Sequence, residues 1–204
     1  MIDLYAAGTS NGMRARIALE ECGLPYTLHP VDLVKGENKT PQFLAMNPNG
    51  QIPVIVDRDG PGGKPLTMSQ STAILIYAAE KSGKFMPKDP ATRAAMLQGL
   101  MSASTDVTPI FGAHFACARA KEPHTAAAQM FKDRVRAMFK VWDDAFAGRK
   151  YCAGDEVSIA DFSLYAGYAR VKGAAADAVE GMPNLARWGE AMAARPAIQR
   201  ALKF

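Results

Sequence analysis

The sequence has few of the residues on which disulfide frameworks, redox motifs and metal sites are built. Three cysteines occur among its 204 residues, and Cys22, Cys117 and Cys152 form no CxxC pair and no metal-ligand spacing. The three histidines are scattered along the chain as well. We therefore expect a chain with reduced thiols, no bound metal and no thiol–disulfide motif of its own.

Long apolar runs and blocks of like charge are absent too. No apolar stretch approaches the roughly 20 residues that cross a bilayer, and residues 1–10 lack the features of a signal peptide. The formal net charge is +4, yet lysine and arginine are dispersed among acids, which gives little support to nucleic-acid binding. We expect a cytoplasmic protein with no membrane and no nucleic-acid partner. The mild basic bias favours a small anionic ligand.

Strand and helix signals alternate over the first 82 residues. Gly and Pro mark the ends of several segments, and Thr40 followed by Pro41 is typical of a helix start. The predicted strands are 2–6, 26–33, 53–57 and 65–68, and the predicted helices are 11–22, 41–46 and 71–81. The order β-α-β-α-β-β-α builds a four-stranded mixed sheet with helices on both faces. We therefore predict an α/β, thioredoxin-like domain over residues 1–82.

The pattern changes after residue 82. Residues 83–90 hold two prolines and two lysines and are predicted to be a linker. Residues 91–204 show no strand signal and are rich in alanine, a strong helix former. Helices are predicted at 91–120, 125–148, 158–172 and 183–194, and the third opens with a capping box at Ser158 and Asp161. We predict an all-α domain over residues 91–204.

In a thioredoxin-like sheet, the reactive group lies at the turn from the first strand into the first helix. Free N–H groups and the positive end of the helix dipole favour a thiolate there. In this chain residues 7–12 read AGTSNG and include no cysteine. Such a domain has either lost its chemistry or uses the thiol of a bound molecule, and the obvious candidate is glutathione.

Two segments closely resemble motifs of the cytosolic glutathione transferases. Residues 47–54 read NPNGQIPV, similar to the family's N-P-x-G-x-I/V-P-x-L segment. Residues 70–78 read QSTAILIYA, similar to its [QE]-S-x-A-I-x-x-Y-L segment. The capping box at Ser158 resembles that of the family's helical half, so the resemblance covers the whole chain. It implies a homodimer with glutathione as cosubstrate and no metal.

The resemblance also implies where glutathione binds. In the family the X-Pro bond of the first motif is cis, so we expect a cis Ile52–Pro53 bond and pairing of the Ile52 backbone with the cysteinyl backbone of the tripeptide. Gln70 and Ser71 are expected to bind its γ-glutamyl end, because Ser71 stands at a helix start that favours a carboxylate. Lys39 is either a partner of the glycyl carboxylate or a solvated lysine.

The residues that contact the thiolate set the subclass. Thr9 and Asn11 resemble the pair that holds the glutathione sulfur in bacterial nu-type members, which are similar to disulfide reductases. Ser10 resembles the hydroxyl donor of theta-like members. A hydroxyl or amide that donates to the thiolate lowers its pKa, so we expect Thr9 and Asn11, with Ser10, to be catalytic. Two structural roles stay open beside this chemistry, Asn11 as a helix N-cap and Thr9 as a turn residue.

The resulting hypothesis is an enzyme that binds glutathione and activates its thiolate for disulfide reduction, for conjugation to small electrophiles, or for both. A non-catalytic binding module on the same fold is the main alternative. A zeta-like isomerase is a further one, because residues 14–19 read RARIAL, although the Ser-Ser-Cys signature expected before this run is absent. By family analogy Asp106 reaches the ligand of a partner subunit. Phe111, Phe115 and Tyr165 either line an electrophile pocket or belong to the core.

Overall fold

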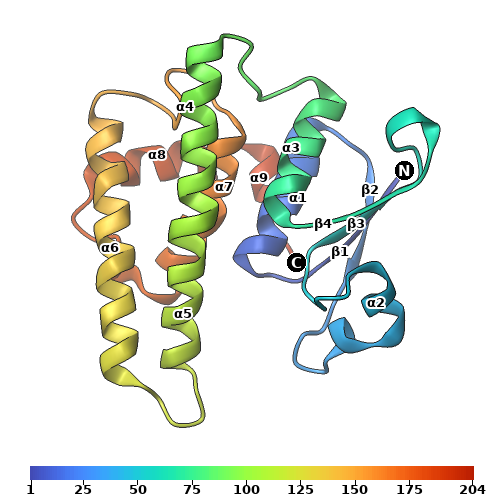
Figure 1. The fold of residues 1–204 in the computed structure, drawn as a ribbon. Coiled ribbons are helices and arrows are strands. Elements are labelled where there is room, and N and C mark those ends of the chain that lie inside the picture. Colours follow the sequence, from blue (N-terminus) through green and yellow to red (C-terminus); the bar gives the residue numbers. More distant parts are fainter. The chain divides into compact units, whose positions relative to one another are not determined.

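The computed structural model describes residues 1–204, which form two compact units (Figure 1). The first unit combines Met1–Met86 with Ala194–Phe204, and the second is Pro87–Ala193. The chain therefore leaves the first unit, builds the second and returns. The domain boundaries 1–82 and 91–204, with a linker at 83–90, stay a prediction. The compact units differ from them mainly in placing residues 194–204 with the first unit.

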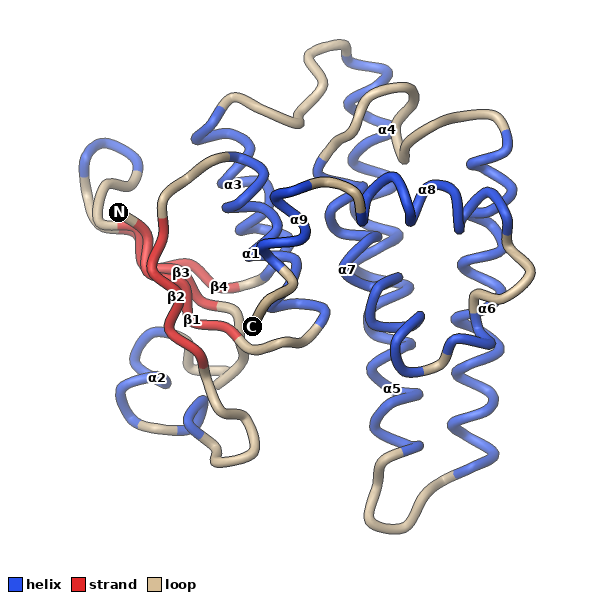
Figure 2. Tube along the Cα trace, turned by 180° about the vertical axis from the view of Figure 1, so that it is seen from behind, coloured by secondary structure: helices blue, strands red, loops and turns tan.

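The first unit is built on a four-stranded mixed sheet with the strand order β2-β1-β3-β4 (Figure 2, red). The strands are β1 (Ile2–Ala6), β2 (Tyr26–Pro30), β3 (Val54–Asp57) and β4 (Leu66–Ser69). Strand β1 runs parallel to β2 and antiparallel to β3, and β4 is antiparallel to β3. The predicted thioredoxin-like arrangement is confirmed.

Strand β2 ends at Pro30 rather than at residue 33. The carboxylate of Asp32 accepts the N–H groups of Val34 (2.9 Å) and Lys35 (3.1 Å). These local bonds offer the backbone an alternative to ladder pairing, so the chain turns and the strand stops. The alternation of residue types that predicted a longer strand carries no information on such side-chain bonds.

Helices cover both faces of the sheet (Figure 2). They are α1 (Ser10–Cys22), α2 (Pro41–Met46) and α3 (Ser71–Ser82). Helices α1 and α3 pack against each other on one face, and α2 lies on the other. Thr40 caps α2 by accepting the N–H of Phe43 at 3.4 Å, as predicted. Phe43 packs with Val31 and Val54 in a buried cluster beneath α2.

Residues 194–204 cover part of α1 within the first unit. Helix α9 (Pro196–Ala201) packs on α1, and two ion pairs join the segment to that helix. Arg195 forms a bidentate pair with Glu21 with two N–O distances of 2.6 Å, and Nε of Arg200 lies 2.7 Å from Glu20. Helix α9 was not predicted, because its six residues carry too little periodicity to be recognised.

The second unit is all-helical, as predicted. Its helices are α4 (Pro90–Met101), α5 (Thr108–Ala118), α6 (Thr125–Ala147), α7 (Ile159–Ala174) and α8 (Pro183–Ala193). A single helix was predicted over 91–120, but a π-helical stretch, Ser102–Val107, separates α4 from α5. Pro109 has no N–H to donate, and its ring crowds the carbonyl four residues earlier. The helix widens there, and the N–H of Thr108 bonds the carbonyl of Ala103 instead.

The predicted capping box opens α7 and ties three segments of this unit together. The buried carboxylate of Asp161 accepts the N–H groups of Ser158 (2.9 Å) and Cys152 (2.9 Å). It also accepts the indole N–H of Trp188 at 3.0 Å, and the Trp188 ring stacks on Phe146.

None of the helices is both long enough and apolar enough to cross a membrane.

Candidate glutathione site

The first element of the candidate site is the turn from β1 into α1. Thr9 is the N-cap of α1, because its Oγ1 accepts the N–H of Gly12 at 3.2 Å. The turn is so tight that a Cβ on Gly12 would lie 2.0 Å from the carbonyl oxygen of Ala7, so glycine is required there. Ser10 is the first helical residue. The N-cap role considered for Asn11 is therefore wrong, since Thr9 fills that position.

Arg14 connects the start of α1 to the start of α3. Its side chain is buried, with 1% of the residue exposed, and Nη1 donates to Oδ1 of Asn11 (2.6 Å) and to Oγ of Ser71 (2.7 Å). The Ser71 hydroxyl donates in turn to Oδ1 of Asn11 at 3.2 Å. Burial lowers the pKa of the Arg14 guanidinium to about 10, so the group stays charged at neutral pH. Three side chains thus form a closed network between two helix N-termini.

This network fixes the orientation of the Asn11 carboxamide. A guanidinium only donates hydrogen bonds, so the atom that faces Arg14 must be the carbonyl oxygen Oδ1. The amino group Nδ2 then points away from Arg14, and no protein atom accepts from it. The Thr9 hydroxyl accepts from Gly12, which leaves its own proton for another acceptor. The Asn11 amino group and the Thr9 hydroxyl therefore both remain available as donors at the start of α1.

The residue before α3 has an unusual backbone conformation. Gln70 has φ 72° and ψ 105°, a region that residues other than glycine rarely occupy. Its side chain is exposed and makes no capping bond. Ser71 follows as the first residue of α3, so its backbone N–H has no partner within the helix. Conformations of this kind tend to cluster at functional sites.

The loop before β3 presents free backbone groups. The Ile52–Pro53 bond is cis, as the resemblance implied. Neither the N–H nor the C=O of Ile52 forms a backbone hydrogen bond, because ladder pairing begins at Val54. Asn47 holds the loop by donating to the carbonyl of Gln51 at 2.7 Å. An extended peptide can therefore pair with Ile52 as a strand pairs with a sheet edge.

Lys39 lies beside this loop. Its Nζ donates to the carbonyls of Asn49 (3.4 Å) and Gly50 (3.2 Å), and the residue is exposed. An ammonium group has three donors, so these two bonds leave one for a ligand carboxylate. The lysine is thus neither purely solvated nor reserved for a ligand.

The cysteines of the protein do not supply a thiolate at the Thr9 turn. Cys22 lies at the last residue of α1, whereas Cys117 of α5 and Cys152 belong to the second unit. Cys22 and Cys152 are buried. Burial raises the pKa of each of these two thiols. Thiol chemistry at the turn therefore requires the thiol of a bound molecule.

Arg14 was missed as a site residue by the sequence reasoning, which treated it only as part of the RARIAL run. The signal was its position three residues after Asn11, where the two side chains share one face of a helix. Its contact with Ser71 spans 57 positions and has no local signature. With the N-termini of α1 and α3, the Arg14 charge makes the site electropositive, which suits a thiolate and a carboxylate.

The predicted pocket aromatics and Asp106 belong to the second unit. Phe111 and Tyr165 are buried in the second unit, with 6% and 5% of each residue exposed, and Phe115 is partly buried. Asp106 is exposed in the π-helical stretch, where its Oδ1 accepts from the Thr105 hydroxyl at 3.1 Å.

Comparison with known proteins identifies the family. Residues 10–81 match the family described as "Glutathione S-transferase, N-terminal domain", and residues 105–203 match "Glutathione S-transferase, C-terminal domain". The chain is 35% identical to "Disulfide-bond oxidoreductase YfcG" of Escherichia coli (strain K12) over 99% of its own length and 94% of that protein.

Solved structures give the same result. A glutathione transferase family member from Pseudomonas fluorescens pf-5 with two glutathione bound matches with a TM-score of 0.93 and 33% identity, over 99% of this chain and 92% of that one. A glutathione transferase from Pseudomonas putida with one glutathione disulfide bound per subunit matches with a TM-score of 0.90 and 31% identity, over 100% and 91%. The chain belongs to the glutathione S-transferase family.

Proposed function

We propose that the protein is a glutathione-dependent disulfide-bond reductase that holds the glutathione thiolate at the start of α1. The observation that carries this proposal is the pair of unused donors, Nδ2 of Asn11 and the Thr9 hydroxyl, in a turn that lacks a cysteine. Both donors stabilise the thiolate over the thiol and therefore lower the pKa of the bound sulfur. The nearby positive charge of Arg14 acts in the same direction.

The rest of glutathione binds to groups that have unused hydrogen-bonding capacity. The free N–H and C=O of Ile52 beside Pro53 pair with the cysteinyl backbone. The Gln70 side chain and the backbone N–H of Ser71 bind the γ-glutamyl carboxylate, because a helix start favours an anion. Lys39 donates its remaining N–H to the glycyl carboxylate.

The reaction needs two glutathione molecules. The first thiolate attacks one sulfur of a disulfide RSSR, which forms the mixed disulfide GS–SR and releases RS⁻. A second glutathione thiolate attacks the glutathione sulfur of the mixed disulfide, forms GSSG and releases the second RS⁻. The two protons lost by the glutathione thiols end on the two RS⁻ groups. The balance is two GSH and RSSR giving GSSG and two RSH.

The relatives are compatible with this reaction. The curated relative at 35% identity is named a disulfide-bond oxidoreductase. One similar structure has two glutathione bound, and another has one glutathione disulfide bound per subunit. Conjugation to an electrophile is the second candidate. It is favoured by the Ser10 hydroxyl, which stands at the first residue of α1 and has no hydrogen-bond partner in the protein.

We further propose that the protein is a cytoplasmic homodimer of two-domain subunits. The apolar residues Leu97 and Met101 of α4 are 38% and 41% exposed and stand four positions apart, so they share one face of the helix. A partner subunit would remove this apolar surface from water. Sedimentation velocity measures the oligomeric state directly, and a monomer at micromolar concentration would contradict the dimer.

The test is a substitution that removes the proposed donor and keeps the network. In Asn11→Asp both oxygens accept, so the bonds from Arg14 and Ser71 persist while the amino donor is replaced by a negative charge. We expect glutathione still to bind, the thiol pKa of bound glutathione to rise by at least about one unit, and the reduction of hydroxyethyl disulfide at pH 7 to fall about tenfold or more. Ultraviolet absorbance of the thiolate reports the pKa.

The matched control is Lys121→Gln, which changes the net charge by the same amount at an exposed residue of the second unit. It should leave both quantities unchanged. Unaltered thiol pKa and disulfide turnover in Asn11→Asp would contradict the proposed role. Conjugation of a chlorodinitrobenzene-type electrophile that exceeds disulfide turnover and falls in Ser10→Ala would favour the transferase. Absence of glutathione binding at millimolar concentration would favour a non-catalytic module.

A further inference from the structure

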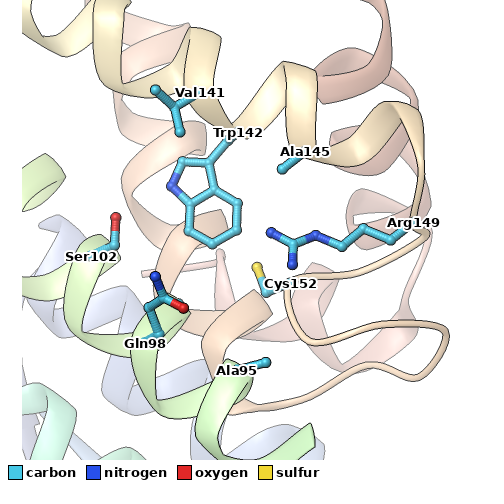
Figure 3. A pocket seen from close by; sticks show the side chains of 9 residues that line it. Ala95, Gln98, Ser102, Val141, Trp142, Ala145, Arg149 and Cys152 are labelled. Carbon is cyan, nitrogen blue, oxygen red and sulfur yellow. The ribbon is translucent and has the colours of Figure 1, made fainter. Parts of the chain in front are cut away.

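A cavity of about 300 Å³ lies within the second unit (Figure 3). Its walls come from α4 and the first residue of the π-helical stretch, from the C-terminal half of α6 and from the segment that follows α6. A volume of this size lies at the lower end of the range for small-molecule sites. None of the residues proposed to bind glutathione belongs to it.

Arg149 is the only charged residue that lines this cavity. Its guanidinium carbon lies 5.6 Å from the centre of the Trp142 ring. Its Nε atom is buried, and no protein atom accepts from it. Buried donors without a protein acceptor are uncommon, so Arg149 has hydrogen-bonding capacity that the protein does not use.

Other donors line the same cavity without protein partners. The indole N–H of Trp142, the Gln98 amide and the Ser102 hydroxyl form no hydrogen bond to the protein. In Figure 3 the Trp142 ring is drawn between Arg149 and Ser102, with Gln98 below it. No aspartate or glutamate is among the lining residues. The cavity therefore offers a cation and further donors, and it contains no carboxylate to neutralise them.

The remaining wall is apolar and unreactive. Ala95, Val141 and Ala145 contribute only aliphatic surface. Cys152 lies at the cavity too, but burial raises the pKa of its thiol well above the ordinary value. The cavity therefore provides no nucleophile, and its chemistry is that of binding.

We propose that this cavity is a binding site for a small organic carboxylate with a compact apolar body. The guanidinium of Arg149 offers two parallel N–H groups that match the two oxygens of a carboxylate. Gln98 and Ser102 supply further donors to the same oxygens, and the apolar body lies against the alanine and valine surface. A cation is excluded by the charge of Arg149.

The experiment uses benzoate as the probe and the two tryptophans of the full chain as reporters. Indole N–H resonances are followed by NMR during titration with benzoate. Saturating glutathione is present, so that benzoate cannot occupy the sites proposed to bind the glutathione carboxylates. Trp142 has a free indole N–H at the cavity, whereas the Trp188 indole donates to Asp161 at 3.0 Å and serves as an internal control. We expect the Trp142 resonance to move and the Trp188 resonance to stay.

Substitutions assign the charge. Arg149→Gln should weaken benzoate binding at least about tenfold, and Lys150→Gln, the same change of charge at the neighbouring exposed residue, should alter it by less than about twofold. Benzamide, which is neutral, should bind more weakly than benzoate. The proposal is overturned if benzoate fails to bind at about ten millimolar, the weak end of measurable affinities. It is also overturned if the Arg149→Gln and Lys150→Gln variants bind benzoate equally. Equal shifts of both indoles also overturn it.

Discussion

Two arginines, one in each compact unit, have opposite surroundings. Arg14 is buried and donates to Asn11 and Ser71, so the protein itself supplies acceptors to its guanidinium. The Nε atom of each arginine is buried without a protein acceptor, so the difference lies at the terminal nitrogens, and those of the partly exposed Arg149 form no hydrogen bond to the protein. The first arrangement organises neighbouring side chains, and the second leaves a donor for a molecule from outside. The bonds around a charged group, rather than its presence in a motif, indicate whether it positions residues or binds a ligand.

The largest expected effect is a difference in the free energy of unfolding between the Arg14→Gln and Arg149→Gln variants. Arg14→Gln leaves Asn11 and Ser71 without their common donor, so we expect the free energy of unfolding to fall by about 2–4 kcal/mol. Arg149→Gln removes no protein hydrogen bond and should change it by less than about 0.5 kcal/mol. Urea-induced unfolding measures both. Equal losses of unfolding free energy in the two variants would contradict the difference proposed between the two arginines. The stability of Arg14→Lys should lie between those of the wild type and Arg14→Gln.

The next comparison concerns a buried carboxylate in each unit. Oδ2 of Asp57 accepts from the Tyr77 hydroxyl (2.6 Å) and lies 2.9 Å from Lys81, and its Oδ1 accepts a backbone N–H. In Asp143 a single oxygen, Oδ1, accepts both backbone N–H groups, from Asn184 and Leu185. Its Oδ2 has only a long contact of 3.4 Å with Lys140, whose side chain is half-exposed. An asparagine keeps one acceptor oxygen. We therefore expect Asp57→Asn to cost about 2 kcal/mol at pH 7 and Asp143→Asn less than about 1 kcal/mol.

The pH dependence of the same pair has a defined sign. Burial raises the pKa of Asp57, but the bonds from Tyr77 and Lys81 outweigh it and the net pKa lies below the ordinary value. Asp57 therefore adds stability that is fully present above the unfolded pKa of about 3.9 and is lost as pH falls through the folded pKa. Unfolding curves from pH 6 to pH 2 should converge for wild type and Asp57→Asn at the acid end. A constant difference across this range would contradict the prediction.

The smallest expected effect is at Gln70. Gln70→Gly removes the conformational cost of φ 72° and should raise the free energy of unfolding by about 0.5–1 kcal/mol. It also removes the side chain proposed to bind glutathione, so glutathione affinity should fall. Gln51→Gly is the control, since Gln51 is exposed and has no positive φ. If Gln70→Gly loses stability as Gln51→Gly does, the backbone of Gln70 is not strained.

Most of the fold could be predicted from the sequence, because it is encoded locally. Strand β1, helix α2 with its Thr40 cap, and the capping box of α7 each depend on residues within a few positions of one another. The π-helical stretch and helix α9 were missed. The first follows from one proline inside an otherwise helical pattern, and the second from a segment too short to show a period.

The sequence likewise indicated only part of the candidate site. Thr9, Asn11, Gln70 and Ser71 stand in contiguous motifs, so the sequence pattern indicated them. It did not indicate how Asn11 and Ser71 are joined, since the contact of Arg14 with Ser71 crosses from α1 to α3. Which oxygen or nitrogen of Asn11 is free follows only from that contact. Nothing in the sequence indicated Arg149, because whether a donor lacks an acceptor depends on the residues that surround it in the folded protein.

The ion pairs between α1 and the segment 194–204 have a consequence for the order in which the protein is made. Glu21 leaves the ribosome 174 positions ahead of Arg195, and Glu20 leaves 180 positions ahead of Arg200. At a translation rate of about 5–20 residues per second, α1 lacks these partners for many seconds while the whole second unit is synthesised. The helix that begins at Ser10 is thus among the first parts of the chain to emerge and among the last to be covered.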